Sequence, residues 1–131
     1  MATAPAFEST QRVGLASVTV ANTNRDGTGT LVDVVTGVTA GTKIDRVVIK
    51  ASGTAATGLL TLFYFDGTTN WLFDEIVITG VVASTTVPSF RADRTYPDLV
   101  IAAATHKLRA AVTVAPTSGA INVEAFGGDL T

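Results

Sequence analysis

One stretch of the chain, residues 58–78 (GLLTLFYFDGTTNWLFDEIVI), constrains the fold more than any other. Its two flanks, 59–65 and 71–78, are rich in aromatic and branched apolar residues, which favour β-strands. The segment between them, DGTTN, has the composition of a turn, because Gly67 can adopt a positive φ and the side chains of Asp66 and Asn70 can bond nearby backbone. The stretch therefore predicts a β-hairpin.

The predicted hairpin is apolar on both faces. A register set by the turn pairs Phe65 with Trp71, Phe63 with Phe73 and Thr61 with Glu75, and it directs five aliphatic residues toward the domain core: Leu60, Leu62, Leu72, Ile76 and Ile78. A half-solvated hairpin would be polar on its other face. We therefore expect the second face to be covered, either by loops of the same chain or by another subunit. The predicted subunit interface comprises Phe63, Phe65, Trp71, Phe73, Arg91, Asp93 and Arg94.

Short runs of β-branched residues divided by Gly-rich turns continue along the chain, at 13–20, 31–35, 42–51, 81–87, 98–102, 107–115 and 121–126. No segment has a sustained helical period. The sequence thus predicts an all-β protein, a jelly-roll-like β-sandwich of about eight strands. A single sandwich domain is expected over residues 12–131. Residues 1–11, small and polar apart from Phe7, are expected to form an extended N-terminal arm, or else a disordered terminus.

Composition excludes several kinds of site and partner. The chain has no cysteine, which rules out disulfides, thiolate metal sites and a cysteine nucleophile. A net charge of −2 gives no reason to expect nucleic acid or a membrane as partner. Charged residues make up 15% of the chain, against about 25% in typical domains. Either much of the surface is buried against a partner, or the protein simply has a Thr-rich, uncharged β surface.

Candidate catalytic residues are few. His106 is the only histidine, and a metal site would need further ligands near it. Asp74 and Glu75 are successive strand residues, so their side chains should point to opposite faces. The Gly-rich segment 26–29 lacks the lysine of a phosphate-binding loop. We therefore expect no catalytic residue, no metal site, no cofactor and no enzymatic activity. The N-terminus has neither a basic segment nor an apolar one, so we expect no secretory signal.

Five segments taken together resemble a known group of proteins. They are NTNRDGTGT at 22–30, KIDRVVIKASGT at 43–54, the hairpin around DGTTN at 63–78, ATH at 104–106 and NVEAFGGD at 122–129. In this order they are similar to small virion proteins of tailed bacteriophages and related prophage particles. The resemblance implies a decoration or cement protein on the capsid surface, often a β-sandwich trimer seated where capsomers meet.

The resulting expectation is a homotrimer, made in the host cytoplasm, that stabilises the virion by binding the major capsid protein across capsomer seams. Phe7 and Arg12 are the predicted capsid-binding residues of the arm, which would act together with one edge of the sandwich. The alternative is a head-fibre, neck or tail adhesin that binds host glycan through Trp71, Tyr96 and Tyr64. A third hypothesis, a small carbohydrate-active enzyme using Asp74 or Glu75, rests on fold class alone.

Overall fold

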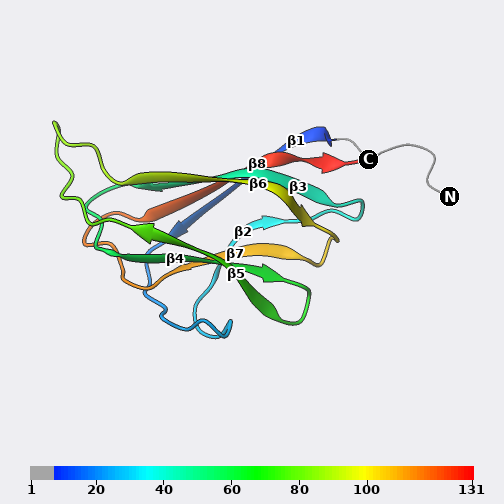
Figure 1. Ribbon diagram of the computed structural model, residues 1–131, viewed down its shortest axis with the longest axis horizontal. Helices are drawn as coiled ribbons and strands as arrows, with labels where there is room; N and C mark the ends of the chain where they lie inside the picture. Colours follow the sequence, from blue (N-terminus) through cyan, green and yellow to red (C-terminus); the bar gives the residue numbers. More distant parts are fainter. Residues whose placement is uncertain (1–7) are drawn as a thin grey trace.

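The computed structural model describes residues 8–131. Its regular elements are eight strands: β1 (Glu8–Val18), β2 (Val32–Thr36), β3 (Thr42–Ala51), β4 (Gly58–Phe65), β5 (Asn70–Ile78), β6 (Arg91–Ile101), β7 (Lys107–Val112) and β8 (Ile121–Leu130). They form two four-stranded antiparallel sheets, in the orders β1-β8-β3-β6 and β2-β7-β4-β5, which pack as two layers (Figure 1). The described residues include no helix that could cross a membrane.

The strand order follows from nested pairing along the chain. The first strand pairs with the last, β2 with β7, β3 with β6, and β4 with β5, and alternate pairs belong to alternate sheets. Two further pairings, β3 with β8 and β4 with β7, complete the sheets. This is the arrangement of a jelly roll. The prediction of an all-β, jelly-roll-like sandwich of about eight strands is confirmed.

The core lies between the two sheets and is almost wholly aliphatic. Its largest fully buried side chains include Ile44, Ile49, Leu60, Leu62, Ile78, Ile101, Leu108 and Ile121. Full burial of one such side chain contributes about 1.5–3 kcal/mol. The expectation that Leu60, Leu62, Ile76 and Ile78 face the core is confirmed.

The register of the central hairpin differs from the prediction beyond one point. Thr61 pairs with Glu75 as expected, but Phe63 pairs with Leu72 and Phe65 with Asn70. A β-bulge causes the shift, since β5 carries one extra residue, Phe73, between its pairs with Leu62 and Phe63. Leu72 therefore lies beside Phe63 on the outer face and is only half-buried, so its predicted place in the core was wrong.

The first strand begins earlier than the sequence suggested. Residues 8–11 belong to β1 and pair with β8, so they are part of the sheet and not of an arm. Their lack of apolar residues concealed the strand, because an edge strand can be held by backbone pairing alone. Phe7 lies outside the described residues.

Candidate interaction surfaces

Arg12 is engaged within the chain. Its guanidinium donates two hydrogen bonds to Asp129 of β8, from Nη2 at 2.6 Å and from Nε at 3.1 Å. The hydroxyl of Thr42 donates a third to the same carboxylate, at 2.8 Å. These bonds, the one to Arg12 first, lower the pKa of Asp129 below its ordinary value. Arg12 therefore lies in β1, and not in an arm, and its charge is paired within the chain, while its predicted role in capsid binding stays a prediction.

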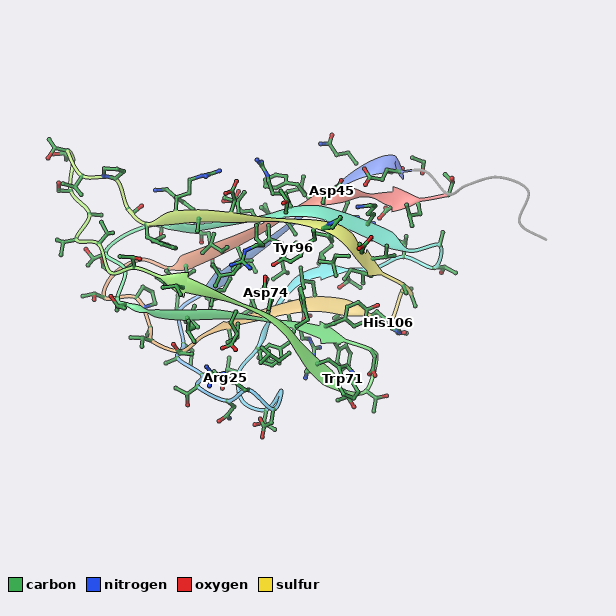
Figure 2. All side chains as sticks on the ribbon, viewed as in Figure 1. Arg25, Asp45, Trp71, Asp74, Tyr96 and His106 are labelled. Atoms are coloured by element: carbon green, nitrogen blue, oxygen red, sulfur yellow. The ribbon has the colours of Figure 1, made fainter. Side chains whose placement is uncertain are left out.

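The connection between β1 and β2 covers the outer face of the second sheet. It contacts β7 on one side of β4, where Asn22 N–H donates to Val112 O at 2.7 Å. On the other side it contacts β5, where Asn70 Nδ2 donates to Gly27 O at 3.2 Å and Arg25 pairs with Glu75 at 2.9 Å. Because β4 lies between β7 and β5, the connection crosses it. Arg25 lies on this segment, beyond the second sheet (Figure 2).

A buried amide holds the covering segment in shape. The side chain of Asn22 donates from Nδ2 to the carbonyls of Thr28 and Thr30, at 2.9 and 3.0 Å, and its Oδ1 accepts from the Asn24 N–H at 3.0 Å. Asn22 is one of few buried polar residues. In the sequence this segment indicated only a turn. Its asparagines could indicate hydrogen bonds from side chains to nearby backbone groups. Nothing in the sequence indicated which strands the segment covers.

Two aromatic residues of the predicted subunit interface are covered within the chain. Phe63 points outward from the core yet has no exposed surface, and it lies on the face of β4 that the β1–β2 connection crosses. Phe65 is half-buried, with the Arg109 guanidinium 3.9 Å from its ring centroid. Arg109 is held there by Asp33, which accepts from its Nε at 2.7 Å. Phe63 is thus excluded from any subunit contact, which corrects the prediction for that residue.

The other five predicted interface residues lie on one lateral side of the sandwich. Trp71 and Phe73 belong to β5, and Arg91, Asp93 and Arg94 to β6; these two strands are the edges of their sheets on that side. Trp71 is 59% exposed and Phe73 37%. Asp93 makes only long ion pairs, to Arg46 at 4.0 Å and Arg91 at 3.9 Å. Exposed pairs of this kind contribute about 0–1 kcal/mol. We call this region the β5–β6 side.

A polar contact joins the two sheets at the β5–β6 side. Asp74 accepts hydrogen bonds from the Tyr96 hydroxyl at 2.6 Å and from Arg94 Nη1 at 3.2 Å, and Asp74 and Tyr96 lie between the layers in Figure 2. Burial, with the bond to Asp74, raises the pKa of Tyr96. The rings of Phe73 and Tyr96 meet edge to face at 5.7 Å. A shallow groove of about 250 Å³ runs beside them, lined by Phe73, Tyr96, Pro97, Asp98 and Leu99.

Tyr64, a predicted glycan contact, has a structural role within the chain. Its hydroxyl accepts the Ala102 N–H at 3.0 Å and lies 2.7 Å from His106 Nδ1. Since the hydroxyl already accepts one bond, its own proton is available for Nδ1. The pair fixes the turn between β6 and β7 against β4. The hydroxyl of Tyr64 therefore has its hydrogen-bond partners within the chain, and a glycan contact of this residue stays a prediction.

The carboxylate of Asp66 organises the hairpin turn and orients Trp71. It accepts from the backbone N–H groups of Thr69 and Thr68, at 2.7 and 2.9 Å, and from Trp71 Nε1 at 2.9 Å. The bond from Thr69, then those from Trp71 and Thr68, lower the pKa of Asp66 to about 2. The turn thus presents a fixed, exposed indole ring.

Acid should release Trp71 only at very low pH. The folded pKa of Asp66 is depressed below its ordinary value of 3.8, so its contribution to stability is complete above pH ~4 and is lost as the pH falls through about 2. Trp71 is the only tryptophan. Its fluorescence should therefore titrate with a midpoint near pH 2, and this transition should be absent in Asp66→Asn. A midpoint near 3.8 in a protein that keeps its far-UV circular dichroism would contradict the prediction.

The outer edge of β1 is the second exposed apolar region. Val13 and Leu15 lie at alternate positions on its outer face, and Leu15 is 67% exposed. Edge strands are usually protected by charges, prolines, bulges or short length. Strand β2 is short and bulged, β5 is bulged at Phe73, and β6 carries Pro97 with several charges. Strand β1 is long, has its only irregularity at Glu8–Thr10, and carries no charge over residues 13–18.

The ionisable side chains are tied mainly into pairs between strands. Asp33 pairs with Lys107 and Arg109, at 3.0 and 2.7 Å. Within residues 8–131, no three histidine or acidic side chains gather as a metal site.

Neither a protein-family model nor a curated protein matches the chain.

Proposed function

We propose that the protein is a structural virion protein that decorates a bacteriophage capsid and binds the major capsid protein across capsomer seams. The observation that carries this proposal is that exposed apolar side chains lie on strands at two opposite edges of the sandwich. Val13 and Leu15 lie on β1, whereas Trp71, Phe73 and Val77 lie on β5, at the other edge. A protein that joins neighbouring partners needs two separate contact surfaces. The resemblance of residues 22–129 to small phage virion proteins supports the same reading.

The energetics of this role suit a nearly uncharged surface. Removal of apolar surface from water contributes about 25 cal/mol per Å², and an uncharged surface loses little hydration when it is covered. Ordering costs offset part of this gain, so each single contact is weak. The stabilisation of the shell is nevertheless large in sum, because the contact is repeated for every copy of the protein on the capsid. The arginines near these surfaces already have acidic partners, as Arg12 has Asp129 and Arg94 has Asp74.

The proposal is tested on intact particles. Mass spectrometry of purified virions should find many copies of the chain, and density maps should locate it on the outer shell at seams between capsomers. Particles lacking it should lose their genome at a lower temperature. Absence of the chain from the shell in such maps would disprove the decoration role.

Self-association is proposed to use the β5–β6 side. Its exposed members are Trp71, Phe73, Arg91, Asp93 and Arg94, and they would contact a neighbouring copy in a trimer. Sedimentation should give a trimer at micromolar concentration, and Phe73→Lys should give a monomer. A stable monomer of the unmodified chain under these conditions would count against a trimer that forms in solution.

A second candidate is an adhesin that binds host glycan, and the fixed indole of Trp71 favours it. Its Nε1–H is held by Asp66 and its ring is exposed, on the same strand as Phe73 of the groove. Exposed aromatic rings of this kind stack on sugars. A glycan-array signal that is lost in Trp71→Ala but kept in Leu15→Ala, with the chain at a tail or fibre tip, would favour this candidate.

A further inference from the structure

We infer that the outer face of the second sheet carries a binding site for a hexuronic acid, in which Arg109 recognises the carboxylate of the sugar. The site is an open hollow of about 580 Å³ between the β1–β2 connection and strands β2, β5 and β7. Small-molecule sites typically have volumes of about 300–1,000 Å³. The inference goes beyond the proposed decoration of a capsid and does not depend on it. The walls of this Arg109 hollow include Gly27, Gly29, Leu31, Asp33, Asn70 and Arg109.

The guanidinium of Arg109 is held in one position. It extends from β7 over β4, where its central carbon lies 3.9 Å from the centroid of the Phe65 ring. Asp33 of β2 accepts from its Nε at 2.7 Å, and the amide oxygen of Asn70 on β5 accepts from its Nη1 at 3.1 Å. Asn70 is fixed in turn, because its Nδ2 donates to Gly27 O at 3.2 Å. A ligand that binds the guanidinium therefore costs little side-chain entropy.

Most N–H groups of this guanidinium have no acceptor within residues 8–131. The bonds to Asp33 and Asn70 use one N–H each, from Nε and Nη1, and Nη2 takes part in neither. No buried side-chain nitrogen or oxygen of the described residues lacks a hydrogen-bond partner, so Nη2 must reach solvent. Arg109 thus offers a fixed, planar set of donors to a ligand in the hollow.

The charges around the Arg109 hollow favour an anion with a single charge. Asp33 is shared by two cations, Arg109 at 2.7 Å and Lys107 at 3.0 Å, so these three side chains keep one excess positive charge. Asp26, on the β1–β2 connection, is turned toward Thr28, whose N–H and hydroxyl donate to it at 3.1 and 2.6 Å. A carboxylate brings one negative charge and matches the planar guanidinium, whereas a phosphate brings about two.

The rest of the wall indicates a sugar as the carrier of the carboxylate. A carboxylate fills only a small part of the hollow, so a ring has room beside it. The carbonyl of Gly27 and the carboxylate of Asp33 can each accept a further bond from a hydroxyl group, while Leu31 adds an apolar surface. A sugar ring has hydroxyl groups and apolar C–H faces. The acidic side chain of a protein has no hydroxyl groups and would leave these acceptors without donors.

An NMR titration of the isotope-labelled full chain tests the inference. The acidic probes are the methyl glycosides of galacturonic, glucuronic and mannuronic acid. Each has a neutral counterpart, the methyl glycoside of galactose, glucose or mannose, and acetate is the carboxylate without a ring. At least one acidic probe should shift the signals of Gly27, Gly29, Asn70 and the Arg109 side chain. Its neutral counterpart and acetate should bind at least about tenfold more weakly, because each lacks part of the recognised chemistry.

Two variants of the hollow and one control test the role of Arg109. Arg109→Lys keeps the charge but loses the planar donors, so it should weaken binding of the acidic probe at least about tenfold. Leu31→Glu leaves Arg109 and its bonds in place and should weaken binding as well, through repulsion between like charges. The matched control is Arg91→Lys, at an exposed arginine of β6, which should bind as the unmodified chain does. Far-UV circular dichroism shows whether each variant folds.

The outcomes differ in what they overturn. If no acidic probe shifts the signals of the hollow, the inference fails, while decoration, which is tested on particles, is unaffected. If a neutral counterpart binds as tightly as its acid, Arg109 does not recognise a carboxylate and the inference is wrong. If acetate binds as tightly as the acidic sugars, the hollow accepts any carboxylate, including that of a protein side chain, and the assignment to a sugar is wrong. Shifts confined to Trp71 and Phe73 would place the sugar on the β5–β6 side instead.

Discussion

Gly127→Ala is expected to destabilise the protein by at least about 3 kcal/mol, a loss beyond the usual range for one added methyl group. Gly127 lies in β8, between β1 and β3, and pairs with Ile44 where β3 bulges before Arg46. A Cβ at this position would overlap the carbonyl group of Lys43. That carbonyl belongs to the backbone of β3, so relief requires a shift of the strand itself. Urea unfolding followed by far-UV circular dichroism measures the loss.

The neighbouring glycine provides the control for Gly127. A Cβ at Gly128 would meet the side chain of Glu8 at 2.8 Å. The atoms met are the Glu8 Cβ and, at 3.1 Å, the Thr10 carbonyl oxygen, and both belong to the first residues of an edge strand, which can shift at smaller cost than the interior strand β3. Gly128→Ala should therefore destabilise the protein clearly less. Equal losses in the two variants would mean that backbone entropy, and not the contact with Lys43, sets the cost at Gly127.

Phe63→Ala is expected to cost about 3–5 kcal/mol, the range for removal of a fully buried aromatic side chain. The expected reason is a cavity under the β1–β2 connection, which spans β4 from Val112 to Asn70 and cannot collapse freely. Phe73→Ala, at a partly exposed bulge position of the same hairpin, should cost much less. Chemical denaturation of both variants gives the comparison.

Whether the same chain or another subunit covers Phe63 can be tested by measuring the destabilisation in Phe63→Ala at several protein concentrations. If its own chain covers it, the loss in Phe63→Ala is the same at all protein concentrations. A residue buried between subunits would instead give a loss that changes with concentration, because dissociation and unfolding would be linked. A concentration-dependent loss would contradict the assignment of the β1–β2 connection as its cover.

Local patterns were sufficient to predict the fold class. Alternating apolar residues and Gly-rich turns predicted an all-β sandwich, and they also placed Leu60, Leu62, Ile76 and Ile78 in the core. The bulge at Phe73 could not be predicted, because a turn sets the register only until an extra residue interrupts the ladder. Strand order lay beyond local patterns as well, since Glu8 pairs with Leu130 at the far end of the chain.

The predicted contact residues fall into two groups, those that are exposed and those that other parts of the same chain cover or bind. Trp71, Phe73, Arg91, Asp93 and Arg94 lie together on the β5–β6 side because β5 and β6 are both edges. Phe63 could not be separated from them by sequence, since only tertiary structure brings the β1–β2 connection over it. Arg12 likewise gave no sign of its partner, because Asp129 is distant in sequence and adjacent only through the pairing of β1 with β8.

The central position of β8 has a consequence for biosynthesis. This strand lies between β1 and β3, so β3 and β6 can pair earlier but β1 cannot join the first sheet until residues 121–130 have left the ribosome. Until then β1 has no strand beside it, and its apolar, uncharged edge is free to pair with other nascent chains. Pairing between distant segments is also slow to form. Production of soluble protein should thus respond more to the rate of translation and to chaperones than to changes on the exposed surface.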